Sequence, residues 1–171
     1  LFYSANQAQT WQQVAWITPP GAIMGRVLTA VGVGRTDIFD GQNSITVRLF
    51  RGSLSSVSEL SLMTGSNHFA YGRPGFWEIV GAQTVTENAD NSFTLTRLIR
   101  GRFGTEDMMT EHESNDYLVL LDATNNYWIG MELSSINAAR KFRMVNRGRS
   151  MESASDIDFA LVNESRVCRQ P

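Results

Sequence analysis

The spacing of the apolar residues constrains the fold of this chain most strongly, because they recur every second residue. In residues 45–50, Ile45, Val47 and Leu49 alternate with polar side chains, as in a strand with one buried and one wet face. No helical period persists beyond about three turns. We therefore predict an all-β fold, a sandwich or barrel-like, with one or two short helices. Further strands are expected over residues 22–33, 75–80, 93–99, 117–121, 127–133, 140–145 and 158–162.

Turn-forming residues join several of these strands. Residues 88–92 are rich in Asn, Asp and Ser, so residues 75–80 and 93–99 are expected to form a hairpin. The pair Asn125 and Asn126 predicts a second hairpin, between residues 117–121 and 127–133.

A short helix is expected between the strands, within residues 55–63. Ser55 or Ser56 can cap its start, and Gly65 can end it. The apolar residues expected on its buried side are Val57, Leu60 and Leu62.

Length and apolar content predict one β-rich domain over residues 1–171. The chain has 171 residues, of which 42% are hydrophobic, enough to bury a core. Residues 1–21 are expected to be an extended lead-in, because Pro19, Pro20 and Gly21 interrupt regular structure. The first residue is Leu1 rather than Met, so we expect the chain to be a fragment of a larger protein. No run approaches the ~20 apolar residues of a spanning helix, so no membrane insertion is expected.

The charge balance argues against nucleic acid as a partner. Fifteen basic and seventeen acidic residues give a net charge of -2, without the positive field on which nucleic-acid binding relies. Cys168 is the single cysteine, which excludes an internal disulfide and a cysteine-based zinc site. The sequence predicts no metal and no cofactor.

Two imidazoles and one acidic cluster are the candidates for polar chemistry. His68 is interpreted as a surface loop residue after the short helix. In residues 105–113, Thr105 is expected to cap a helical turn, with Glu106 and Asp107 at its positive end. A metal site is the less favoured interpretation, because the cluster lacks the spacing of calcium and zinc ligands. A glycosidase pair made of Glu78 and Glu106 is a further, less favoured alternative.

Two basic runs, residues 97–102 and 140–149, together hold seven of the fourteen arginines. The favoured interpretation is that these strand-borne charges pair with carboxylates across a sheet. Binding of an anionic glycan or a phosphate is the alternative. Aromatic side chains offer another binding chemistry, since exposed indoles stack on sugar rings. The candidate glycan-binding residues of a carbohydrate-binding module are Trp11, Trp16 and Trp128.

Several motifs occur in a recognisable order between residues 49 and 122. Residues 54–57 and 62–67 come first, followed by residues 77–82. The strongest segment is residues 93–106, which includes Arg100, Gly101, Gly104, Thr105 and Glu106, and His112 and residues 119–122 continue it. Together they resemble the large tail-tip, or baseplate-hub, proteins of long-tailed phages and of gene transfer agents. Ile99 and Asn115 depart from the family pattern, where Leu and Gly are usual, and Asn tolerates the left-handed backbone that such a Gly supplies.

The resemblance implies a structural and adhesive domain of a tail-tip hub, without enzymatic activity. It implies a virion component at the tail tip, made in the bacterial host cytoplasm, with a role in host recognition, host attachment and tail assembly. The implied partners are other tail-tip or baseplate proteins, further copies in a homotrimer, and a host surface receptor or glycan. The motif is expected to be architectural, with Arg100 bonding carbonyls or Glu106 across a strand-to-helix corner. The structural residues are Arg100, Gly101, Gly104, Thr105, Glu106 and His112.

Overall fold

The computed structural model describes residues 1–16, 21–122, 129–130 and 135–160, which divide between two compact units. The first, here the sheet unit, comprises Leu1–Pro19 and Tyr127–Pro171. The second, here the barrel unit, is Pro20–Asn126. From the sequence we predicted one domain over residues 1–171, without a boundary between two units.

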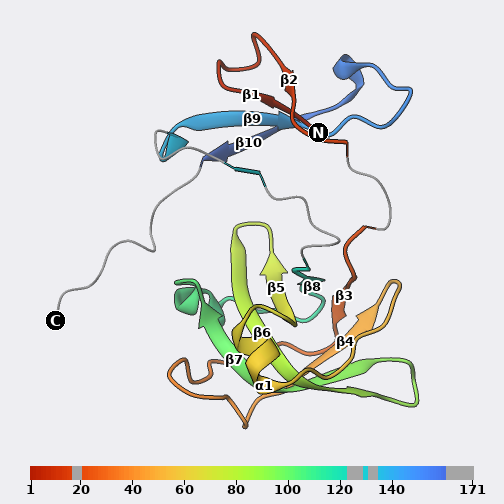
Figure 1. Cartoon of the computed structure of the whole chain (residues 1–171), viewed down its shortest axis with the longest axis vertical. Helices are drawn as coiled ribbons and strands as arrows, with labels where there is room; N and C mark the ends of the chain where they lie inside the picture. The colour runs from red at the N-terminus through yellow and green to blue at the C-terminus, as the bar shows by residue number, and fades with distance from the viewer. Residues whose placement is uncertain (17–20, 123–128, 131–134, 161–171) are drawn as a thin grey trace, which may run out of the picture. The chain divides into compact units, whose positions relative to one another are not determined.

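Six antiparallel strands of the barrel unit form a closed barrel (Figure 1). Their order is β3 (Met24–Val27), β4 (Ile45–Leu49), β7 (Phe93–Arg102), β6 (Phe76–Glu87), β5 (His68–Arg73) and β8 (Tyr117–Leu120). The barrel closes because β8 pairs with both β5 and β3. The predicted all-β fold with short helices is confirmed.

Alternating side chains fill the barrel interior, as the period of two predicts. In β4, Ile45 and Val47 are fully buried, whereas Thr46 between them is half-buried and Arg48 after them is exposed. The buried core consists of Val27, Val31, Ile45, Val47, Phe69, Tyr71, Val80, Ala82, Phe93, Leu95, Leu98, Leu118 and Leu120.

The predicted hairpin of β6 and β7 is present, and its strands are longer than predicted. The pairing register shifts between Ile79 and Gly81, which marks a bulge. A Cβ at Gly81 would lie 2.6 Å from Cγ1 of Ile99 and 2.9 Å from Cδ2 of His68. Only glycine lets these two neighbouring strands bring their side chains together here.

Two strand predictions differ from the structure. The strand expected over residues 22–33 is only β3, because the last backbone bond to β4 is from the Leu28 N–H to the Thr46 carbonyl at 2.8 Å, and the Val31 N–H instead donates to the Tyr71 hydroxyl. Strand β8 pairs with β3 and β5. The other half of its predicted hairpin, residues 127–133, falls largely outside the described residues.

The predicted short helix is α1 (Glu59–Met63). Ser58 caps it, rather than Ser55 or Ser56, by accepting from the Ser61 N–H at 3.1 Å. Leu62 is fully buried, but Leu60 is 76% exposed. A five-residue helix makes little more than one turn, so only one of its apolar side chains faces the barrel. The described residues also include the 3₁₀ turns η1 (Glu106–Thr110) and η3 (Met151–Ser153).

Four short strands form the sheet unit, in the order β10 (Asp156–Ala160), β9 (Ala139–Arg143), β1 (Phe2–Ser4) and β2 (Gln12–Gln13). Two of them lie in the predicted lead-in, and Figure 1 shows β1, in red, beside β9, in blue. On one face Phe142 packs between Tyr3 and Phe159, at ring-centroid distances of 5.4 and 5.9 Å. Among the helices of the described residues, none has the length and apolarity to cross a membrane.

Candidate functional site

A buried ion pair lies at the centre of the Arg100 motif. Arg100 on β7 and Glu78 on β6 have fully buried side chains. Nε of Arg100 donates to Oε1 of Glu78 at 2.7 Å, and an Nη2 bond to Oε2 at 2.8 Å makes the pair bidentate. The remaining Nη1 donates to the Gly32 carbonyl at 3.1 Å and lies 3.5 Å from Oδ2 of Asp40. Arg100 therefore connects two strands to the loop between β3 and β4.

Glu78 has further partners beyond Arg100. The Gly101 N–H donates to its Oε1 at 2.8 Å, and Nε2 of His112 lies 2.7 Å from its Oε2. Burial by itself raises the pKa of Glu78. The hydrogen bonds from His112 and Arg100, with the Arg100 charge, outweigh burial and hold the pKa below its usual value. The carboxylate is therefore charged at neutral pH.

His112 extends the network toward the other side of β5. Its ring stacks on Tyr71 at a centroid distance of 3.7 Å and an angle of 12°. Nδ1 of His112 lies 3.6 Å from Oδ2 of Asp116, which in turn pairs with Arg73 at 3.4 Å. Burial raises the pKa of Tyr71 to about 12, so its hydroxyl stays neutral and accepts from the Val31 N–H. The network thus ties β5, β6 and β7 to the segments before and after them.

The chain turns sharply directly after Arg100. Gly101, Phe103 and Gly104 have φ values of +59°, +58° and +77°, the left-handed region in which glycine has no steric penalty. A Cβ on Gly101 would lie 2.9 Å from Cα of Glu106. This segment is the strand-to-helix corner between β7 and η1.

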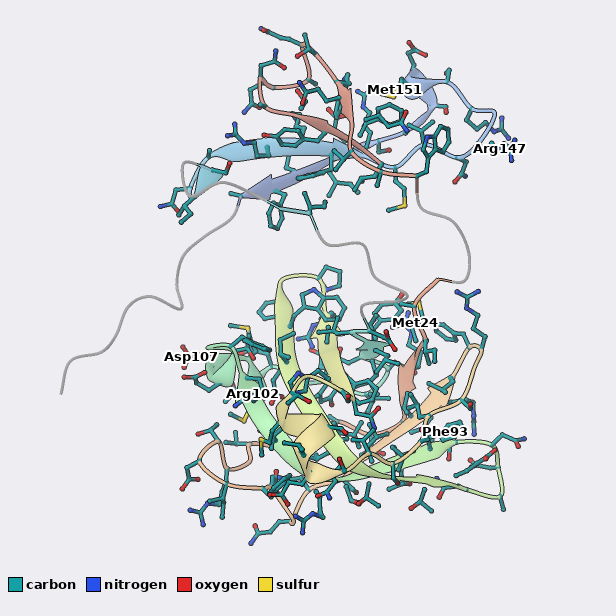
Figure 2. The ribbon with its side chains drawn as sticks, in the orientation of Figure 1. Met24, Phe93, Arg102, Asp107, Arg147 and Met151 are labelled. Carbon is teal, nitrogen blue, oxygen red and sulfur yellow. The ribbon has the colours of Figure 1, made fainter. Side chains whose placement is uncertain are left out.

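Thr105 holds the corner by a different bond from the expected one. Its hydroxyl donates to the Arg102 carbonyl at 2.8 Å and accepts from the Ile79 N–H at 2.9 Å. It makes no side-chain cap on η1, because both bonds point back to the hairpin. Glu106 and Asp107 are exposed at the start of η1, and Asp107 projects outward (Figure 2). The carboxylates that meet Arg100 are those of Glu78 and, at 3.5 Å, Asp40, and not that of Glu106.

The two carboxylates considered for glycoside cleavage have opposite environments. Glu78 is fully buried and bonded to Arg100, Gly101 and His112, whereas Glu106 is exposed. The geometry gives Glu78 no free oxygen to offer a sugar. In the part of the chain that the structure describes, no group of three or more His, Cys, Asp or Glu side chains is placed to hold a metal ion.

His68 is buried, so its interpretation as a surface loop residue is wrong. It begins β5 and is 5% exposed, packed edge-on against Phe103 at a centroid distance of 6.0 Å. Burial, with the nearby Arg102 charge, lowers the pKa of His68. The sequence-based interpretation missed β5 because its first residues follow a helix end and its pattern includes a glycine.

The tryptophans predicted for glycan binding differ in exposure. Trp16 is 73% exposed. Trp11 is half-buried, and the Arg143 guanidinium lies 4.5 Å from its ring centroid, so one face of the indole is covered. Trp128 lies outside the described residues.

Half of the eight basic residues in the two runs, Arg97, Arg100, Lys141 and Arg143, are paired with carboxylates, the interpretation favoured above. Arg97 meets Glu59 at 3.4 Å in the first run. Lys141 meets Asp158 at 2.7 Å and Arg143 meets Asp156 at 2.5 Å in the second. Two members of the second run, Arg147 and Arg149, are exposed in the loop between β9 and β10, and Arg147 points away from the sheet (Figure 2).

The described geometry defines a class of domain: a closed six-stranded antiparallel barrel with a buried ion pair, Arg100 and Glu78, between two neighbouring strands. Residues 22–119 match the family model described as Rcc01698-like, C-terminal. Since the match covers more than half of the chain, the chain belongs to the Rcc01698-like C-terminal family. The matched residues include strands β3 to β7 in full and β8 except for its last residue, Leu120. No curated protein matches the chain.

Proposed function

We propose that this chain is a structural and adhesive domain of the tail-tip hub of a phage-like particle, either a gene transfer agent or a phage or prophage. Its role in this proposal is architectural and not enzymatic. Membership of the Rcc01698-like family supports the proposal, and so does the order of the tail-tip-like motifs in the barrel unit. The observation that carries it is the use of those motif residues to build the barrel corner.

The chemistry of the corner suits a framework. Arg100 and Glu78 are fully buried, and each donor or acceptor that the structure describes for them faces another part of the protein. Buried pairs of this kind define one arrangement, because any other leaves a charge unpaired in a poorly solvating interior. Five segments of the barrel unit share the network, so it fixes the loops as well as the strands.

The proposed setting is the tail tip of an assembled virion. There the domain would act beside other tail-tip or baseplate proteins, within a homotrimeric hub, during tail assembly and attachment to a host receptor or glycan. The exposed apolar side chains of the barrel unit, such as Phe103 at 69% and Leu60 at 76% exposure, are consistent with contacts to neighbouring subunits.

Immunogold electron microscopy tests the location directly. Antibodies raised against the chain are applied to particles from an induced lysate of the source organism, with the same antibodies pre-absorbed on purified chain as the control. Gold at the tail tip that disappears on pre-absorption is the expected result. Bare particles, with antigen confined to the soluble fraction, would overturn the proposal.

A further inference from the structure

The loop between β9 and β10 carries two arginines that do not take part in the ion pairs of the sheet. The basic residues of the second run differ in their surroundings. Lys141 and Arg143 meet carboxylates, as described above. Arg147 and Arg149 have no carboxylate within salt-bridge distance among the described residues. Their guanidinium groups therefore keep their donors available.

Local hydrogen bonds give this loop a defined shape. The Arg149 N–H donates to the Asn146 carbonyl at 3.0 Å, which closes a turn with Gly148 at φ +81°. Nη1 of Arg143 donates to the Met151 carbonyl at 3.2 Å and ties the loop back to β9. The turn places the side chains of Asn146 and Arg149 next to each other, because they are its first and last residues.

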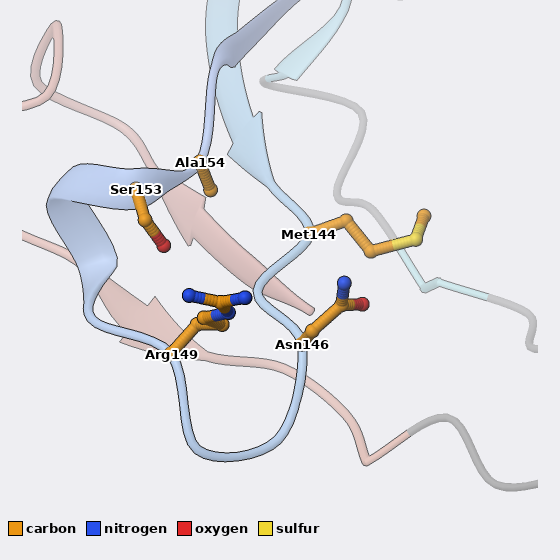
Figure 3. A pocket seen from close by; sticks show the side chains of 5 residues that line it. All are labelled: Met144, Asn146, Arg149, Ser153 and Ala154. Atoms are coloured by element: carbon orange, nitrogen blue, oxygen red, sulfur yellow. The ribbon is translucent and has the colours of Figure 1, made fainter.

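Arg149 lines an open hollow on the inner side of the loop. The hollow has a volume of about 260 Å³ and is lined by Met144, Asn146, Arg149, Ser153 and Ala154. Figure 3 shows the guanidinium between the side chains of Ser153 and Asn146. This volume lies below the ~300–1,000 Å³ of sites for drug-sized ligands, so it suits a single small unit of a ligand.

The polar groups around the hollow favour a particular ligand chemistry. A free guanidinium binds a carboxylate through two parallel hydrogen bonds. The Asn146 amide offers both donors and an acceptor. The Ser153 hydroxyl already donates to the Ser150 carbonyl at 2.7 Å, so it is left as an acceptor for a ligand hydroxyl. A carboxylate next to several hydroxyls is the chemistry of an acidic sugar.

We propose that this hollow binds acidic saccharides, with Arg149 holding the sugar carboxylate and Asn146 and Ser153 bonding its hydroxyls. The site lies in the sheet unit, outside the residues matched by the family model. The proposal keeps the anionic-glycan alternative that was considered for residues 140–149 and names Arg149 as the residue that binds the anion. Trp11, Trp16 and Trp128 are not needed for it.

Titration of the purified chain with a trimer of galacturonic acid tests the site. Binding is followed by calorimetry, and the contacted residues are found from amide shifts in an NMR spectrum. Saturable binding with shifts confined to residues 144–154 is expected. Arg149→Gln should weaken it by about 10- to 100-fold, the loss of a charge-assisted bond pair. The matched control is Arg147→Gln, which removes the same charge from the same loop and should change the affinity by less than about threefold.

Three results would overturn the proposal. The first is no saturable binding of the acidic trimer, and the second is equal weakening by Arg147→Gln and Arg149→Gln, which would indicate diffuse charge attraction. The third is binding of a neutral galactose trimer, acetate or inorganic phosphate as tightly as the acidic trimer, which would leave only a sugar or an anion preference. Both variants change exposed side chains and should fold, as circular dichroism can verify. The assay uses the free chain, so its failure and a failure of the tail-tip location are separate results.

Discussion

The barrel and the sheet use the same kinds of ion pair in opposite surroundings. In the barrel unit, Arg100 and Glu78 have side chains that are 0% exposed. In the sheet unit, the Lys141 and Asp158 side chains are 21% and 79% exposed. Both pairs join neighbouring strands, and both come from basic runs that look alike in the sequence. Burial therefore decides what such a pair does for the structure.

The two surroundings have different physical consequences. Water and salt screen the exposed pairs, which then contribute little to stability. The buried pair has lost its hydration, so removing one partner leaves the other charge without compensation. The barrel should consequently depend on its pair far more than the sheet depends on its own.

Arg100→Ala is expected to have the largest effect. It leaves Glu78 buried without its bidentate partner, which should lower the free energy of unfolding of the barrel unit by about 3–5 kcal/mol. Amide exchange followed by mass spectrometry measures this on peptides of β6 and β7. Arg97→Ala, on the same strand but at an exposed pair, is the control and should change little. Equal effects of the two variants would contradict an architectural role for Arg100.

Gly101→Ala should have the next largest effect. The left-handed φ costs about 1–2 kcal/mol for a residue with a Cβ, and the contact with Glu106 at 2.9 Å adds an overpacking cost of about 1–3 kcal/mol. Gly148→Ala is the matched control, since its φ is also positive but nothing lies within 4 Å of the added Cβ. Denaturant unfolding compares them, and a Gly148→Ala loss as large as that of Gly101→Ala would argue against the close approach.

Acid should destabilise the barrel through Glu78. Its pKa in the folded protein is held below the ordinary value of 4.5, so its contribution is fully present above about pH 4.5 and is lost as the pH falls through the lower, folded pKa. The urea midpoint of the barrel unit, measured between pH 7 and pH 2.5, should fall more steeply in the wild type than in Glu78→Gln. Parallel pH profiles would show that Glu78 carries no such linkage.

Lys141→Ala should have the smallest effect. The pairs of Lys141 with Asp156 and Asp158 are on the surface, where about 1 M salt screens charges beyond roughly 3 Å. Any loss of thermal stability at low salt should therefore vanish at high salt, whereas the loss from Arg100→Ala should persist. A salt-independent loss for Lys141→Ala would mean that its aliphatic stem, and not its charge, stabilises the sheet.

Short-range sequence patterns predicted the elements whose formation depends on residues close together in the sequence. The hairpin of β6 and β7, the strands β4 and β8, and the helix α1 all have periodic or turn-forming residues within a short window. Asn115, placed where the family pattern has Gly, has a φ of +70°, consistent with the tolerance of Asn for that region. Barrel closure was beyond such patterns, because β3 and β8 are far apart in the sequence and nothing local specifies their pairing.

The role of Glu78 was also beyond the local patterns, although one signal was present. A carboxylate stands between Trp77 and Ile79 in an apolar strand, where a charge must be paired if it is buried. The hairpin turn predicts the next strand as its neighbour, and Arg100 is a basic residue near the end of that strand. The partner was obscured by the bulge at Gly81, which shifts the register that simple counting from the turn would give.

The order of the strands along the chain has a consequence for synthesis on the ribosome. Strand β1 pairs with β9, and every strand of the barrel is translated between these two. At about 5–20 residues per second, β1 emerges roughly 7 to 27 s before its partner. The barrel can be complete in that interval, since none of its pairings needs a residue beyond β8. Strands β1 and β2 must therefore stay soluble without β9, the partner of β1, while the barrel folds.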